Sequence, residues 1–283
     1  MFNKNLQQVI GVAPGAVAVL TVQPEAATLV GVRFTLGGTT FDTSKINRVR
    51  VKIGPRVIQD LTGAQLLAIN AYKNGASNTK QLWLDFAERD QANFPIKEIG
   101  GIDLMSVLSV GQVNIELTID ATAVAPTVVA QGYFEAPQGN SAVLKMLPFS
   151  FSQAAAGKFT LPLQLRGAML KRLWMQYSGT NWTASANGNI SRLECKKNGL
   201  VFSDLFCLDN RFDQAQNKKV PQGNFYVADF IVDNNHDANV ATMRRLPNGQ
   251  LVYDAFEFNA YLTDAGGSNV TVIAEVLDAV TNL

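Results

Sequence analysis

The heptapeptide Ile46–Lys52, INRVRVK, returns 144 positions later as Ile190–Lys196, ISRLECK. Two further segments recur at the same offset: VIQDL at 57–61 as VFSDL at 201–205, and LDF at 84–86 as ADF at 228–230. Upstream, the apolar stretch 15–23 corresponds to 157–165. Each match is weak alone, but a near-constant offset over more than seventy residues indicates that the chain contains an internal duplication.

The two copies predict the same order of strands, turns and one short helix. In the first copy we expect strands at 16–22, 29–36, 48–53, 81–86, 113–119 and 127–134. In the second copy we expect strands at 159–165, 170–177, 192–196, 224–232, 255–262 and 269–276. A further apolar run follows the turns Gly54-Pro55 and Asn198-Gly199. A helix comes next in each copy, capped by Thr62 in the first and carrying Leu205, Leu208 and Phe212 at helical spacing in the second.

The strand pattern predicts the fold class. Apolar and polar residues alternate cleanly over Val113–Ile119, which is typical of a sheet with one buried face. Helices are too few for parallel βαβ crossovers. We therefore predict an all-β chain of two tandem jelly-roll β-sandwiches with short helices in the connections, at residues 1–138 and 139–283. The alternative is two generic β-sandwiches with accidental matches.

Composition excludes several classes of function. The chain has 283 residues, with 24 Lys and Arg against 23 Asp and Glu and a single histidine. A net charge of +1 argues against coating nucleic acid by bulk electrostatics, and one histidine excludes sites that need several. Charged residues are scarce at 17%, so we expect partners to cover much of the surface. We interpret Cys195 and Cys207 as free thiols in the core.

An apolar stretch near the beginning of the chain could be read as a signal peptide or as a strand. The nearly apolar stretch Val9–Val22 resembles the apolar region of a signal peptide, but Pro14 and Gly15 interrupt it and it is too short for a membrane span. Because a similar strand recurs in the second copy, we interpret residues 16–22 of this stretch as a buried strand and expect no signal peptide.

Few residues suggest chemistry. Asp233 and Asp237 flank Asn234, Asn235 and His236, and oxygen ligands of this kind suit a cation such as calcium. The segment lacks the EF-hand pattern, so a solvated turn is the favoured interpretation and the two aspartates are weak metal candidates. We predict no catalytic residues and no cofactor, with a structural calcium possible but not indicated.

Carboxylates and basic pairs have simple structural interpretations. Asp60 and Asp85 recur as Asp204 and Asp229, and duplication with the fold favours turn or cap roles over a catalytic pair. For the basic pairs Lys171-Arg172 and Arg244-Arg245 the default interpretation is a solvated surface.

A family resemblance adds to this interpretation. The stretch Ile46–Asn74, with its INRVRV strand, Gly54-x-Arg56 turn and leucine-rich helix, resembles the major coat protein of corticovirus-type tailless phages. The resemblance continues through four segments, namely Trp83–Arg89, Ile102–Met105, Val110-Gly111 and Val113–Asp120, and on to Gln131. The second half matches mainly in layout.

The resemblance implies a double jelly-roll major capsid protein of the adenovirus–tectivirus lineage. Three such chains form a trimer with a nearly six-sided outline, and trimers tile an icosahedral shell over an internal membrane around double-stranded DNA. The partners implied are other copies of the chain, vertex or spike proteins, membrane proteins and membrane lipid, without specific binding of nucleic acid. The resemblance also implies that the chain is located in the virion capsid, which is assembled in the host cytoplasm. It implies that the chain is not an enzyme.

Two other functions remain open at this point. A two-jelly-roll glycan hydrolase would place two carboxylates in a groove, in one copy only. A carbohydrate-binding spike or appendage module would expose tryptophan rings, for which Trp83, Trp174 and Trp182 are candidates, although Trp83 and Trp182 are predicted to lie in the core.

Overall fold

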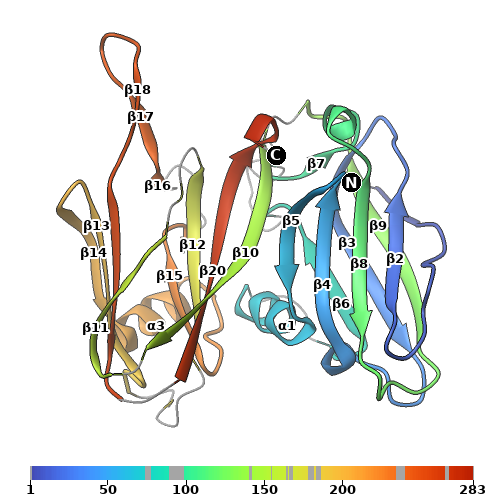
Figure 1. Cartoon of the computed structure of the whole chain (residues 1–283), viewed down its shortest axis with the longest axis horizontal. Coiled ribbons are helices and arrows are strands. Elements are labelled where there is room, and N and C mark those ends of the chain that lie inside the picture. Colours follow the sequence, from blue (N-terminus) through green and yellow to red (C-terminus); the bar gives the residue numbers. More distant parts are fainter. Residues whose placement is uncertain are drawn as a thin grey trace. The chain divides into compact units, whose positions relative to one another are not determined.

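The computed structural model divides into two compact units (Figure 1). Unit 1 comprises Met1–Ala71, Gly75–Leu147 and Leu277–Leu283, and unit 2 comprises Tyr72–Asn74 and Pro148–Val276. The structure describes residues 2–73, 78–88, 99–139, 142–153, 155–163, 165, 168–177, 182, 186–233, 240–264 and 268–282.

Unit 1 contains two sheets. The first has the order β1-β9-β3-β6, with β7 beside β3, and its strands are β1 (Phe2–Asn5), β9 (Thr127–Glu135), β3 (Thr28–Gly37), β6 (Gln81–Asp85) and β7 (Ile102–Asp103). The second has the order β10-β5-β4-β8-β2, and its strands are β10 (Ala142–Gln153), β5 (Arg56–Leu61), β4 (Ile46–Ile53), β8 (Val113–Ile119) and β2 (Val17–Val22). The helix α1 (Gly63–Tyr72) follows β5, and the 3-10 turns are η1 (Thr43–Lys45), η2 (Ser106–Ser109) and η4 (Val280–Asn282).

Unit 2 repeats this arrangement. One group of neighbouring strands has the order β15-β12-β20-β10, with β16 beside β12, and contains β15 (Phe225–Asp229), β12 (Met169–Tyr177), β20 (Ser268–Ala279) and β16 (Val240–Ala241). The strands β10 and β20 each have residues in both units, since unit 2 begins at Pro148 and ends at Val276. The other group has the order β11-β19-β13-β14 and contains β11 (Gly157–Leu161), β19 (Phe256–Leu262), β13 (Ile190–Lys197) and β14 (Leu200–Phe206). The helix α3 (Cys207–Gln216) follows β14, and β17 (Met243–Arg245) and β18 (Leu251–Tyr253) form a projecting hairpin (Figure 1).

The strand registers confirm the predicted duplication. The pair β4–β5 has a bulge between Val51 and Lys52, and the pair β13–β14 has one between Cys195 and Lys196, 144 positions later. The pairs β4–β8 and β13–β19 also share an irregularity, which begins at Ile46 and at Ile190. Because bulges are local and specific backbone features, their recurrence at one offset identifies the two sandwiches as copies of one design.

The duplicated aspartates have duplicated contacts. Arg48 Nε donates to Asp60 Oδ1 at 2.6 Å across β4 and β5, and Arg192 Nε donates to Asp204 Oδ1 at 2.5 Å across β13 and β14. The hydrogen bond from Arg192 lowers the pKa of Asp204.

The second duplicated pair of aspartates closes the turn after a strand. Asp85 accepts a hydrogen bond from the backbone N–H of Ala87, and Asp229 accepts one from the backbone N–H of Ile231. Both pairs of aspartates thus stabilise local structure in each unit.

The helices begin differently in the two units. Thr62 Oγ1 accepts from the N–H of Gln65 while Gln65 Oε1 accepts from the N–H of Thr62, which is a capping box and confirms the predicted cap. In unit 2, Leu205 belongs to β14, and α3 begins only at Cys207. The prediction that placed Leu205 on the helix was wrong because leucine at a helical spacing from Leu208 also fits an exposed apolar strand.

The core is apolar and follows the sequence pattern. Val49 and Val51 of β4 are buried with Ile115 and Leu117 of β8, as predicted. Their counterparts Leu193 and Cys195 are buried in β13. The strand expected at 16–22 is also confirmed as β2, in which Ala18, Leu20 and Val22 are buried. In the described part of the chain, no helix is long and apolar enough to cross a membrane.

A buried ionic cluster lies within unit 2 and corrects one prediction. Lys171 and Arg172 on β12 are fully buried rather than solvated. Arg172 Nε lies 3.0 Å from Asp229 Oδ2, and Arg172 Nη1 lies 3.0 Å from Glu275 Oε1. Two carboxylates on neighbouring strands thus neutralise a charge that could not otherwise remain in the interior.

Three more side chains complete this cluster. The Nε1 of Trp174 donates to Glu275 Oε2 at 2.9 Å, and Lys73 Nζ lies 3.0 Å from Glu275 Oε1. The hydroxyl of Tyr72 donates to Asp229 Oδ2 at 3.0 Å. Burial, and then the neighbouring charge of Asp229, raise the pKa of Tyr72 well above its usual value, so its hydroxyl keeps the proton that it donates.

Removing one charge from this cluster tests how much the cluster contributes to the free energy of unfolding. Glu275→Gln keeps the shape of the side chain but leaves Arg172 and Lys73 short of an anion, so we expect a loss of about 3–5 kcal/mol in the free energy of unfolding. The measurement is urea-induced unfolding followed by tryptophan fluorescence. The matched control is Glu257→Gln, whose carboxylate pairs with Lys158 at the surface and should change stability little. Equal unfolding midpoints for the two variants would contradict the assignment.

The cysteines provide a second test of the core. Cys195 and Cys207 are free and buried, and desolvation raises the pKa of each to about 12. At pH 8 only about one thiol in ten thousand is then a thiolate, which is the reactive form. We expect Ellman's reagent to leave both thiols unmodified in the native chain and to label both in concentrated urea. Rapid labelling of either thiol in the native chain would show that this part of the core is open.

Candidate interaction surface

The two units differ most at one pair of equivalent strands. In unit 1, Ile58, Gln59 and Leu61 of β5 are buried. In unit 2, the corresponding strand β14 is exposed along most of its length. Leu61 is 2% exposed, whereas Leu205 in the equivalent register position is 38% exposed. The same strand of the same sandwich is therefore covered in unit 1 and open in unit 2.

The exposed apolar side chains continue from β14 onto α3. We call them the β14–α3 surface, which comprises Leu200, Val201, Phe202, Leu205, Phe206, Leu208 and Phe212. Leu200 is 75% exposed and Phe212 is 63% exposed. Large exposed apolar side chains that gather on one strand and on the helix after it are typical of interaction sites.

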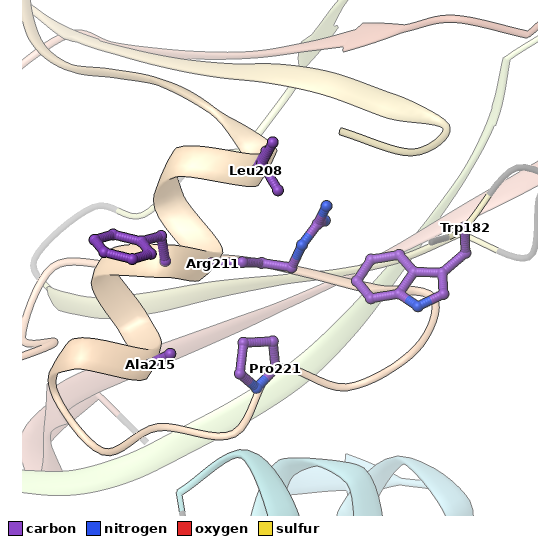
Figure 2. A pocket seen from close by; sticks show the side chains of 6 residues that line it. Trp182, Leu208, Arg211, Ala215 and Pro221 are labelled. Atoms are coloured by element: carbon purple, nitrogen blue, oxygen red, sulfur yellow. The ribbon is translucent and has the colours of Figure 1, made fainter. Parts of the chain in front are cut away.

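A shallow hollow of about 340 Å³ lies next to this surface. Its lining residues are Trp182, Leu208, Arg211, Phe212, Ala215 and Pro221 (Figure 2). The guanidinium carbon of Arg211 lies 4.6 Å from the centre of the Trp182 ring, and Arg211 also donates to the backbone carbonyl oxygens of Ala186 and Asn187. Burial lowers the pKa of Arg211, which stays charged at neutral pH. The hollow thus has an apolar rim and a fixed cation.

The tryptophans are not arranged as an exposed sugar platform. Trp174 is fully buried in the ionic cluster. Trp83 is half-buried and packs edge-on against Tyr133, with ring centres 4.7 Å apart. Trp182 packs against the core of unit 2 and also lines the hollow.

The candidate metal residues occupy a turn. Asp233 is exposed in the turn after β15, whereas His236 and Asp237 lie outside the described residues. Within the ranges that the structure describes, no three His, Cys, Asp or Glu side chains gather as a metal site would require. A calcium site at Asp233 and Asp237 stays a prediction.

The candidate carboxylates are engaged in structure. Asp60 and Asp204 pair with arginines, Asp85 holds a turn, and Asp229 belongs to the buried cluster. The basic residues Arg244 and Arg245 are exposed on β17, as predicted.

The β14–α3 surface has a signal in the sequence, in the apolar residues of its strand. The strand β5 reads RVIQDL, in which polar residues interrupt the apolar ones. Its counterpart β14 reads LVFSDLF, which is apolar at positions on both faces of the strand. A strand that ends a four-stranded sheet and is apolar on both faces predicts a partner that the chain itself does not supply.

Comparisons with known proteins agree with this architecture. Residues 3–135 match the family model described as viral coat protein P2 N-terminal domain, and residues 143–280 match the model described as viral coat protein P2 C-terminal domain. The predicted division after residue 138 falls between these ranges and remains a prediction. No curated protein matches the chain by sequence.

Solved structures show the same fold at low sequence identity. The major capsid protein P2 from bacteriophage PM2 is similar with a TM-score of 0.78 and 16% identity, over 98% of this chain and 97% of that one. The major capsid protein of STIV is similar with a TM-score of 0.65 and 11% identity, over 98% and 96%. PBCV-1 VP54 is similar with a TM-score of 0.59 and 12% identity, over 98% and 94%.

The two family models together span nearly the whole chain, one for each sandwich. The chain therefore belongs to the viral coat protein P2 family and is a capsid protein of a virus.

Proposed function

We propose that this coat protein assembles into homotrimers of nearly hexagonal outline, which tile an icosahedral shell over an internal membrane. It acts as a building block and turns over no substrate. Vertex or spike proteins, membrane proteins and membrane lipid are its neighbours in the particle, and assembly takes place in the host cytoplasm. The resemblance of the strands and turns to corticovirus-type coat proteins supports each of these points.

The observation that carries the proposal is the open β14–α3 surface. Three chains with two similar units each place six similar units around the three-fold axis of a trimer. The same kind of contact can then form between each unit and the next one around the ring. Unit 1 buries the apolar residues of β5, whereas unit 2 leaves those of β14 in water. A neighbouring subunit that covers β14 gives both units the same surroundings. Exposed phenylalanines such as Phe206 and Phe212 are also the kind of anchor that dominates subunit contacts.

The low charge of the chain is consistent with this role. A net charge of +1 lets many copies pack without strong mutual repulsion. It also supports a coat that encloses DNA behind a membrane without binding it specifically. The scarcity of charged residues suits large lateral interfaces, whose centres are depleted in charge.

Size-exclusion chromatography with light scattering tests the trimer. The unmodified chain should elute as a species of three chains at micromolar concentration. Phe212→Asp places a charge on the β14–α3 surface and should weaken association roughly 30-fold or more, the effect of losing a contact worth about 2 kcal/mol.

The control for this experiment is Tyr253→Asp on the β17–β18 hairpin. Tyr253 is 60% exposed, against 63% for Phe212, so the two substitutions disturb the isolated fold to a similar degree. The control should remain a trimer. A strictly monomeric unmodified chain would refute the proposed function, and equal association of the two variants would show that the β14–α3 surface is not the contact.

A further inference from the structure

Two of the strands that end a sheet in the described part of the chain are β14 and β1. The strand β14 ends the sheet β11-β19-β13-β14, and β1 ends the sheet β1-β9-β3-β6. An exposed edge presents a row of backbone N–H and C=O groups that can pair with another strand. Each edge therefore offers the same kind of bonding that holds the sheets together.

The duplication shows what covers the counterpart of β14. Within unit 1, the outer edge of β5 pairs with β10 in parallel, with Met146 opposite Gln59. The counterpart of Gln59 at the offset of 144 is Ser203, in the middle of β14. The position that β10 fills beside β5 is empty beside β14 among the described residues.

The counterpart of β10 is β1. In its sheet β1 lies next to β9, with Phe2 opposite Phe134, and β10 lies next to β20, the counterpart of β9. All four residues of β1 are exposed, and Phe2 is 49% exposed. Thus β1 lies next to β9 as β10 lies next to β20, but within the described residues only β10 pairs with a second strand.

We propose that β1 of one copy pairs in parallel with β14 of a second copy and extends its sheet. This inference rests on the proposed trimer and names its contact. Each chain gives one β1 and receives one at β14, so three such head-to-tail contacts close a ring and leave neither edge open. The pairing repeats between chains the β10–β5 pairing that one chain makes within itself.

The side chains are compatible with this pairing. Lys4 is the one charged residue of β1, and Asp204 is the one charged residue of β14, so no like charges are brought together. Phe2 adds an apolar ring to the β14–α3 surface. Closing the ring also removes two edges that would otherwise favour open-ended aggregation.

Engineered disulfides test the pairing. We would combine Asn3→Cys on β1 with Val201→Cys in one variant and with Ser203→Cys in another, to span the register. The native Cys195 and Cys207 are buried with a raised pKa and should not interfere. After mild oxidation with copper phenanthroline, at least one variant should run as covalent dimers and trimers on a non-reducing gel. The control combines Asn3→Cys with Asn248→Cys, an exposed position in the β17–β18 turn, and should stay monomeric on the gel.

Light scattering on the same samples separates the two claims. A trimer by light scattering that yields no cross-link in either test variant overturns the β1–β14 pairing while the proposed trimer stands. Cross-linking of the control as efficient as that of the test variants also overturns it. A monomer by light scattering overturns both.

Discussion

Backbone groups at the edge of a sheet need hydrogen-bond partners, and this requirement is met differently in the two units. The strands β5 and β14 occupy the same place in two copies of one sandwich. In unit 1, β10 pairs with β5 and the apolar residues of β5 are buried. In unit 2, the edge and side chains of β14 face solvent. Of these two equivalent strands, β5 has a neighbouring strand on its outer edge and β14 has none in the described part of the chain, so another subunit can supply one.

The conserved and divergent features of the two copies separate architecture from specialisation. The bulges, the Arg–Asp pairs across β4–β5 and β13–β14, and the aspartates after β6 and β15 are present in both units. They shape the sheets and turns that any such sandwich needs. The buried cluster around Arg172 and Glu275 is specific to unit 2, because Gly31, which lies opposite Asp85 in unit 1, is replaced by Arg172, which lies opposite Asp229. Such a cluster fixes one arrangement of strands, because its charges cannot be separated without leaving an ion unpaired in the interior.

Sequence reasoning was sufficient for the fold and incomplete for the surface. The recurrence of INRVRVK as ISRLECK located β4 and β13, and the alternation in Val113–Ile119 gave β8 with its bounds unchanged. It failed for the buried pair Lys171-Arg172, because the counterions of Arg172, Asp229 and Glu275, lie more than fifty residues away and leave no local pattern. It also assigned Leu205 to a helix, since apolar spacing alone does not separate a helix from an exposed apolar strand. The open edge of β14 is a property of the sheet order, which the sequence shows only indirectly through the apolar composition of LVFSDLF.

Hydrogen exchange of the assembled protein tests the central claim most directly, because β5 serves as an internal reference for β14. If a second copy completes the sheet of unit 2, the outward amides of β14 should exchange as slowly as those of β5 in the trimer. They should exchange faster than those of β5 in a dissociated sample. Fast exchange of β14 in a trimer whose β5 amides are protected would contradict the account.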